Sequence, residues 1–242
     1  YESGKGKQKE RAIQVGPENM TPNSSLYFLY AVDLAHLSRE AINTLYAPKA
    51  RRQSWHDIEI AVCTLNNHAD NWFSRLPIQF DFTKLDTNQQ FPRQRTSLAF
   101  RFYATKLIIL QPCLRCSFQP SEASSPGTVC DQMASLCVQM AGQMLDLLPE
   151  EPDFTWLYGV APWWCILHNI IQSTTILLTE LLTRTHTGTA KAVDISKKIN
   201  KATRWLKDIS TKDLSSQRAW LVCMDLLSRH GSKFGICENT EL

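Results

Sequence analysis

The segment LAFRFYATKLIILQP, residues 98–112, constrains the fold of this chain most strongly. Its apolar side chains recur three and four positions apart, which places them on two neighbouring stripes of a helix: Leu98, Phe102 and Ile109 on one, and Ala99, Tyr103, Leu107 and Leu110 on the other. A helix with so wide an apolar face must be covered by several neighbouring elements. We expect it to span residues 94–111 and to end before Pro112, because the proline ring fixes φ and its nitrogen has no hydrogen to donate.

Helical periodicity extends over most of the remaining chain. The further segments that show it are residues 26–46, 54–75, 129–148, 160–183, 191–209 and 213–229. Asn23-Ser24-Ser25 and Asp213 stand where helix N-caps are expected. No segment alternates as a strand does, and nine glycines in 242 residues are few for a Rossmann fold or a β-sandwich. The sequence predicts an all-α fold, a compact array of about seven to nine helices without significant sheet.

The chain divides into one helical domain with a polar segment at each end. Residues 1–24 are polar and charged and predict a flexible arm, residues 25–230 form the helical domain, and residues 231–242 form a C-terminal tail. The net charge is only +3, and the basic residues are scattered rather than gathered in a stripe. Direct DNA binding by this segment is therefore not expected.

The longest apolar run, residues 160–182, has the length of a membrane span. Polar residues interrupt it at His168, Asn169, Gln172, Ser173 and Glu180. Such groups are costly in lipid, so we expect no membrane span here but the central helix of a soluble protein.

The cysteines give no sign of a metal or redox centre. Cys130 and Cys137 lie on the apolar face of residues 129–148, where buried free thiols are expected. Cys113-x-x-Cys116 has ligand-like spacing, but a structural zinc site needs four ligands and a second pair is missing. The pair also follows a predicted helix end, whereas a redox-active pair is expected at a helix N-terminus. We therefore expect no metal and no cofactor.

Several short motifs occur in an order that is known from one family. A tryptophan helix ends in Leu76-Pro77, and the aromatic helix after it ends in Gln111-Pro112, where the family usually has Arg-Pro. Upstream, a helix ends in Leu45-Tyr46, and downstream Pro162-Trp163-Trp164 begins a long helix. Over residues 26–229 the chain resembles the middle homology region of fungal binuclear zinc-cluster transcription factors.

This resemblance implies a regulatory domain rather than the part that reads DNA. In the family a six-cysteine zinc cluster reads DNA, and nothing in this sequence reproduces that cysteine array. DNA would be contacted only through a separate zinc-cluster region that is not in this chain. The implied partners are a small-molecule effector or a partner protein, with a homodimer as a further alternative. The implied location is the nucleus, with the cytoplasm as the alternative.

A polar stripe runs along residues 160–183. The side chains that share this helix face are His168, Gln172, Thr175 and Thr179. Two explanations remain open. Hydrogen bonds to neighbouring helices would make the stripe structural, since unpaired buried polar groups cost about 1–3 kcal/mol each. Alternatively, the stripe is the wall of a cavity, since small-molecule sites are mostly apolar with a few placed polar groups.

The cavity explanation brings in aromatic residues. Trp163 and Trp164 would lie near the cavity mouth. Tyr103 and Arg101 lie on the aromatic helix, where Arg101 either faces a pocket or is solvated or paired. The candidate ligand-binding residues are Tyr103, Trp163, Trp164, His168 and Gln172.

Two functions from different classes remain open. In the first, a small molecule or partner protein shifts the helix packing and so controls DNA binding or activation elsewhere in the protein. In the second, a family member without the zinc cluster has become a biosynthetic enzyme of the cyclase or isomerase type, with His168 as acid–base in the same cavity. The sequence contains no G-x-S-x-G, no H-E-x-x-H and no glycine-rich phosphate loop, so no catalytic motif supports the enzyme.

Overall fold

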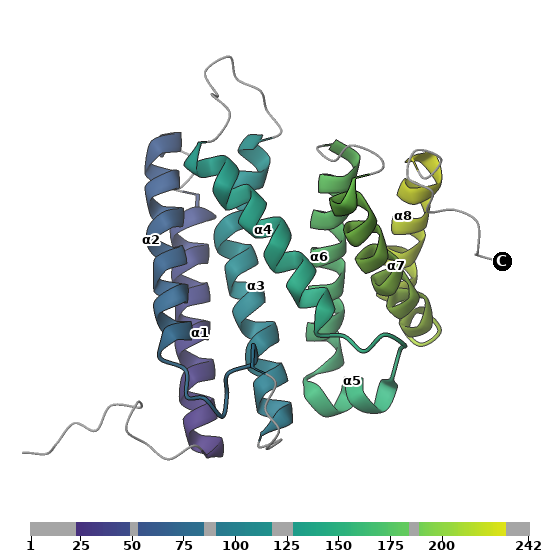
Figure 1. Cartoon of the computed structure of the whole chain (residues 1–242), viewed down its shortest axis with the longest axis horizontal. Helices are drawn as coiled ribbons and strands as arrows, with labels where there is room; N and C mark the ends of the chain where they lie inside the picture. The colour runs from purple at the N-terminus through teal and green to yellow at the C-terminus, as the bar shows by residue number, and fades with distance from the viewer. Residues whose placement is uncertain (1–22, 49–52, 85–90, 118–127, 184–188, 231–242) are drawn as a thin grey trace, which may run out of the picture.

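The structure is a computed structural model, and it describes residues 23–48, 53–84, 91–117, 128–183 and 189–230. For Ser24, residues 115–117 and His230 it describes the backbone alone. These parts of the chain form eight helices and no strand (Figure 1), which confirms the predicted all-α fold. The predicted arm and tail lie outside the described residues, except for Asn23 and Ser24.

The helices follow the predicted segments closely. They are α1 (Ser24–Leu45), α2 (Trp55–Ser74), α3 (Pro92–Ser117), α4 (Val129–Asp146), α5 (Phe154–Val160), α6 (Trp163–Thr183), α7 (Ala190–Ser210) and α8 (Leu214–His230). Both expected N-caps are present: Asn23 Oδ1 accepts from the Leu26 N–H at 2.8 Å, and Asp213 Oδ2 accepts from the Ser216 N–H at 2.7 Å.

One helix boundary was predicted in the wrong place near residue 160. The predicted helix over residues 160–183 begins only at Trp163, and the short helix α5 precedes it. Pro162 separates the two, since proline is tolerated at the start of a helix but not inside one. Helix α5 has seven residues, too few to show a period, and Asp153 caps it by accepting from the N–H groups of Thr155 and Trp156.

The prediction that Pro112 ends the aromatic helix is also wrong, because α3 continues through it to Ser117. Pro112 removes the N–H that would donate to the carbonyl of Ile108, four residues earlier. The hydroxyl of Tyr46, at the end of α1, donates to that carbonyl at 2.7 Å. A side chain from another helix therefore supplies the hydrogen bond that the proline cannot make.

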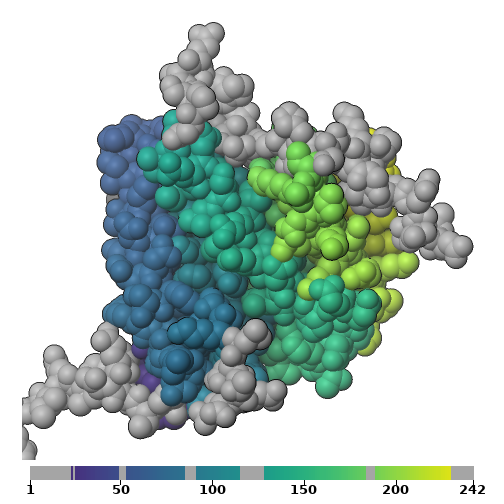
Figure 2. Space-filling view, viewed as in Figure 1, coloured from purple at the N-terminus to yellow at the C-terminus, as the bar shows by residue number. Residues whose placement is uncertain are grey.

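Helix α4 joins two groups of helices. It crosses in front of α3 and α6, with α1 and α2 beyond α3 on one side and α7 and α8 beyond α6 on the other (Figure 1). In the space-filling view, the side chains of α4 (teal) cover this junction from the front (Figure 2). The arrangement makes α3 and α6 the central helices, because each packs against elements from both groups.

An aromatic cluster fills the core between α1, α2 and α3. Trp72 is 3% exposed and stacks on Phe102, with ring centroids 5.7 Å apart. Tyr30 meets the same indole edge-on at 6.0 Å, and the indole N–H donates to the Tyr30 carbonyl at 3.2 Å. Because each such side chain buries a large apolar area, this cluster contributes strongly to stability.

A buried charge lies beside this cluster. The ammonium of Lys106, on α3, is 2.5 Å from Asp70 Oδ1 and 2.7 Å from Asn66 Oδ1, both on α2. Burial lowers the pKa of Lys106, and the hydrogen bond and charge of Asp70 oppose that lowering. The chain itself provides the partners that a buried cation requires.

Helix α6 is long and apolar enough to cross a membrane by length and composition. In the structure, 61% of its most apolar window is buried against other helices. Its acidic residue, Glu180, is buried and pairs with Lys191 of α7. These packing contacts are those of a central helix in a helical domain.

Candidate ligand cavity between α3 and α6

A cavity of about 350 Å³ lies between α3 and the first turns of α6. Its volume lies at the lower end of the range typical of small-molecule sites. The wall from α3 consists of Ser97, Phe100, Arg101 and Ala104. The opposite wall consists of Ala161, Pro162, Trp164, Cys165, Ile166, His168 and Asn169.

The local sequence explains why these residues meet. On α3, Ser97, Arg101 and Ala104 are spaced i, i+4 and i+7, which puts them on one face. The small side chains of Ala104 and Ala161 leave space between the two walls.

Two polar side chains of the cavity have no partner in the described part of the chain. Arg101 is exposed and makes no salt bridge or side-chain hydrogen bond with any described residue. Asn169 is only 8% exposed, and its amide likewise finds no hydrogen-bond partner among the described residues. The amide atoms of Asn169 nevertheless keep contact with solvent, so water can bond to them in place of a protein group. By contrast, the Ser97 hydroxyl lies 3.0 Å from the Tyr27 hydroxyl and is paired.

Two of the sequence-predicted residues line this cavity. Trp164 is 59% exposed, and its ring meets that of Trp163 edge-on at 6.1 Å. His168 lies one turn further along α6 and is also exposed. Gln172 follows after another turn, half-buried and outside the lining, so the structure brings Trp164 and His168 together but places Gln172 beyond them.

The polar stripe of α6 continues past the cavity, and its hydroxyls are paired within the helix itself. Thr175 donates to the Ile171 carbonyl at 2.8 Å, and Thr179 donates to the Thr175 carbonyl at 2.7 Å. At these two positions the hydroxyls therefore bond one turn back along α6, rather than to neighbouring helices as one of the two explanations supposed.

Tyr103 lies on a different side of α3. It follows Arg101 by two residues, which rotates it by about 200° around the helix. Its side chain is 7% exposed and packs edge-on against Phe82 at 5.7 Å. Burial raises the pKa of Tyr103, with a smaller contribution from the charge of Asp146. Tyr103 is thus separated from Trp164 and His168 by the body of the helix.

A second hollow, of about 380 Å³, lies on the other side of Arg101 between α1 and α3. Arg39 and Ile42 of α1 line it, and the Ser38 and Thr105 hydroxyls, 2.7 Å apart, join the two helices there. Arg101 and Ala104 line both hollows, so the two hollows adjoin at α3.

Aromatic contacts connect the α3–α6 cavity with α7. Phe100 lines the cavity and meets Trp156 of α5 edge-on at 6.3 Å. Trp156 in turn meets Trp205 of α7 at 5.7 Å. The indole N–H of Trp205 donates to the Pro149 carbonyl at 3.0 Å. A chain of packed rings therefore leads from the cavity wall to the connection between α4 and α5.

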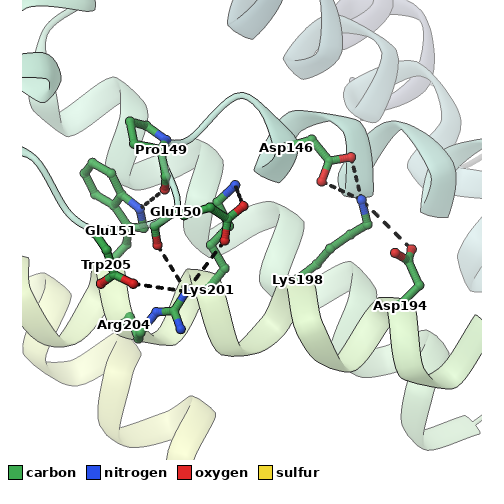
Figure 3. A network of polar contacts seen from close by, with 9 residues as sticks. All are labelled: Asp146, Pro149, Glu150, Glu151, Asp194, Lys198, Lys201, Arg204 and Trp205. Atoms are coloured by element: carbon green, nitrogen blue, oxygen red, sulfur yellow. Dashed lines mark hydrogen bonds and ion pairs between the residues drawn. The ribbon is translucent and has the colours of Figure 1, made fainter.

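Ion pairs fix α7 at the end of this chain of rings (Figure 3). Lys201 Nζ lies 3.0 Å from Glu150 Oε1, and Arg204 donates to the Glu150 carbonyl at 3.1 Å. The hydrogen bond and charge of Lys201 lower the pKa of Glu150. Lys198 pairs with Asp146, the last residue of α4. These contacts hold α7 against α4 and the segment that follows it.

No described group of three or more His, Cys, Asp or Glu residues is arranged to hold a metal ion. Cys113 is buried on α3, and its carbonyl lies 3.5 Å from the Cys130 sulfur; the side chain of Cys116 lies outside the described part. His168 is exposed and has no hydrogen-bonded partner among the described residues to orient it. This geometry does not favour the enzyme alternative, since acid–base catalysis needs a positioned group.

Asn169 was not predicted to line the candidate cavity, and the role of Arg101 was left open. A signal for Asn169 was present, because an amide interrupts an apolar run there. The neighbouring polar positions carried the same signal, and only the packing of α3 against α6 distinguishes them.

The chain is 31% identical over 251 residues to a protein of Aspergillus niger that is named transcription regulator galc. The similarity covers 89% of this chain but 30% of that protein. The chain is thus similar to one part of a fungal transcription regulator. It spans less than a third of the length of that relative. No protein-family model matches the chain, and no solved structure matches it.

Proposed function

We propose that this chain is a regulatory domain of a fungal transcription regulator and that it senses a small molecule in the α3–α6 cavity. The observation that carries the regulatory part is the similarity to transcription regulator galc along 89% of the chain. DNA would be read by a separate zinc-cluster region, in agreement with the low net charge of +3 in this segment. The protein would act in the nucleus.

The sensing part of the proposal is supported by the cavity lining. Arg101 and Asn169 have no partner in the described chain, while apolar and aromatic groups surround them. A ligand changes activity only if it prefers one helix arrangement over another. A shift of the cavity wall would be transmitted to α7 through the packed rings of Phe100, Trp156 and Trp205.

The experiment that tests this function is transcript profiling after deletion of the gene, followed by complementation. We expect a defined set of transcripts to fall on deletion and to recover with the wild-type gene. In the complemented strain, an Ala104→Phe variant, which fills the cavity, should restore the level of folded protein. The transcripts of the set should then no longer change with growth conditions. Ala104→Ser keeps the space and serves as the matched control. Unchanged transcripts together with an accumulating metabolic intermediate would contradict the proposal and favour an enzyme.

A partner protein instead of a small molecule would give a different pattern. A protein seated on the outer face would still bind when Ala104→Phe fills the space between the helices. The response would then survive in Ala104→Phe and be lost when the exposed Trp164 is changed to Ala.

A further inference from the structure

We propose that the α3–α6 cavity takes a small organic carboxylate with a flat apolar body, held by Arg101 and Asn169 through its carboxylate and by Phe100 and Trp164 through its body. This inference rests on the proposed function, because it names the ligand class of the same cavity. The cavity lining contains two polar side chains, Arg101 and Asn169, that have no partner among the described residues.

The charge of the cavity favours an anion. Arg101 is the one cationic guanidinium among the described lining residues, and none of those residues is acidic. Helix α3 contains no Asp or Glu along its whole length, and the carboxylate of α6, Glu180, is committed to Lys191. An anion that enters the cavity therefore meets the Arg101 guanidinium, and no carboxylate of the lining, of α3 or of α6 competes with it for that cation.

Three lysines of low side-chain exposure differ from Arg101, which in this respect resembles the exposed Arg93 and Arg218. Lys106, Lys198 and Lys201 each have a carboxylate within 3.0 Å. Arg101 has none among the described residues. Its planar fork matches the two oxygens of a carboxylate better than a lysine would.

Asn169 adds the second polar contact from the opposite wall. Its side chain is nine-tenths buried, lines the cavity, and has no partner in the described chain. An amide NH₂ can donate to a carboxylate oxygen, which accepts several hydrogen bonds at once. A ligand carboxylate would thus replace water at both groups, one on α3 and one on α6.

The remaining walls define the ligand body. Phe100, Ala104, Trp164 and Ile166 offer apolar surface, and Trp164 is largely exposed. A volume of about 350 Å³ corresponds to roughly a dozen water molecules of liquid, so it fits a body of about that many non-hydrogen atoms. An inorganic anion would satisfy Arg101 but leave these apolar walls uncovered, which makes an aromatic or alicyclic acid the better match.

The test compares 2-naphthoate with 2-naphthamide, two probes of the same shape that differ in charge. Binding to the whole chain is measured by ligand-observed NMR and calorimetry. We expect the acid to bind at least about tenfold more tightly than the amide, as one charge-assisted hydrogen bond would give. Arg101→Gln should remove this preference, and Asn169→Ala should weaken binding of the acid.

Matched variants keep the result interpretable. Arg39→Gln removes an arginine from the neighbouring hollow and should leave the preference intact. Ala104→Phe should abolish binding of both probes if they occupy the cavity. Thermal melting of each variant identifies any that fails to fold, and Arg101→Gln, at an exposed position, should melt like the wild type.

Three outcomes would overturn the proposal. Equal binding of acid and amide, unchanged in Arg101→Gln, would show that the cavity takes a neutral ligand; the ligand class would be wrong while the proposed function stands. Binding of the acid that survives Ala104→Phe would place it outside the cavity. Failure of both probes to bind the folded wild type at millimolar concentration would remove this ligand class, whereas the proposed function would fail only if transcripts stayed unchanged on deletion of the gene.

Discussion

Helix α3 carries two cationic side chains in opposite situations. Lys106 is buried between α2 and α3, where Asp70 and Asn66 of the same chain bind its ammonium. Arg101, five residues earlier, faces a cavity and has no partner among the described residues. Where the interior is closed, the chain completes its own polar contacts. Where it is open, Arg101 has no partner among the described residues, and the proposed ligand would supply one.

The largest expected effect is a difference in stability between removing Trp72, on the core side of α3, and removing Trp164, on the cavity side. Trp72→Ala should lower the free energy of unfolding by about 3–5 kcal/mol, because it removes a buried indole stacked on Phe102. Trp164→Ala, on the cavity side, should change it by no more than about 0.5 kcal/mol, since the ring is 59% exposed. Urea unfolding of both variants measures the difference. A comparable loss in the two would show that the cavity side is part of the core.

The next effect concerns the partners of Lys106. Asp70→Ala should destabilise the fold by about 1–3 kcal/mol, because it leaves a buried ammonium with Asn66 alone. The loss stays below that of a fully buried pair, since the Asp70 side chain is 54% exposed and water reaches it. In a Lys106→Met background the same change should cost less, because only the hydrogen bond from Asn66 Nδ2 to Asp70 Oδ2 is then lost. Equal losses in both backgrounds would mean that Asp70 acts through contacts other than Lys106.

A smaller effect tests how α3 passes Pro112. Tyr46→Phe should cost about 1 kcal/mol, because the Ile108 carbonyl loses its hydrogen bond. Pro112→Ala restores an N–H at that position, so the cost of Tyr46→Phe should shrink on this background. A double-mutant cycle by chemical unfolding measures the coupling. Additive effects would contradict the role given to the tyrosine hydroxyl.

This example marks the boundary of what the sequence could predict. Apolar periodicity placed the long helices because it depends on neighbours three and four residues away. The continuation of α3 past Pro112 depends on Tyr46, which is 62 residues from Ile108 in sequence. No local pattern contains that contact, so the helix end was predicted too early.

The candidate site follows the same rule. The aromatic helix has apolar residues on most of its circumference, so periodicity could not tell which side meets Phe82 and which meets the cavity. Tyr103 was grouped with Trp164 and His168 for that reason. On α6 the apolar run marked its polar positions, but only the neighbour α3 decides that His168 and Asn169 reach the cavity and Gln172 does not.

The smallest effect changes reactivity rather than stability, and it again compares the open and closed regions. Cys165 lines the cavity and is exposed, whereas burial raises the pKa of Cys137 to about 12 and that of Cys223 to about 11. The thiolate is the reactive form, and a raised pKa makes it rare at neutral pH. We expect iodoacetamide to label Cys165 in the native chain and to reach Cys137 and Cys223 only after unfolding, as read by peptide mass spectrometry.

Labelling also reports on the cavity. Saturating 2-naphthoate should slow the modification of Cys165 several-fold, because the bound acid would cover the wall on which the thiol lies. Cys63, half-buried on α2, serves as the internal control and should be modified at the same rate with and without the acid. If the modification of Cys165 and Cys63 slows equally, the acid acts on the whole fold. It would then not bind in the cavity beside Arg101, contrary to the proposal.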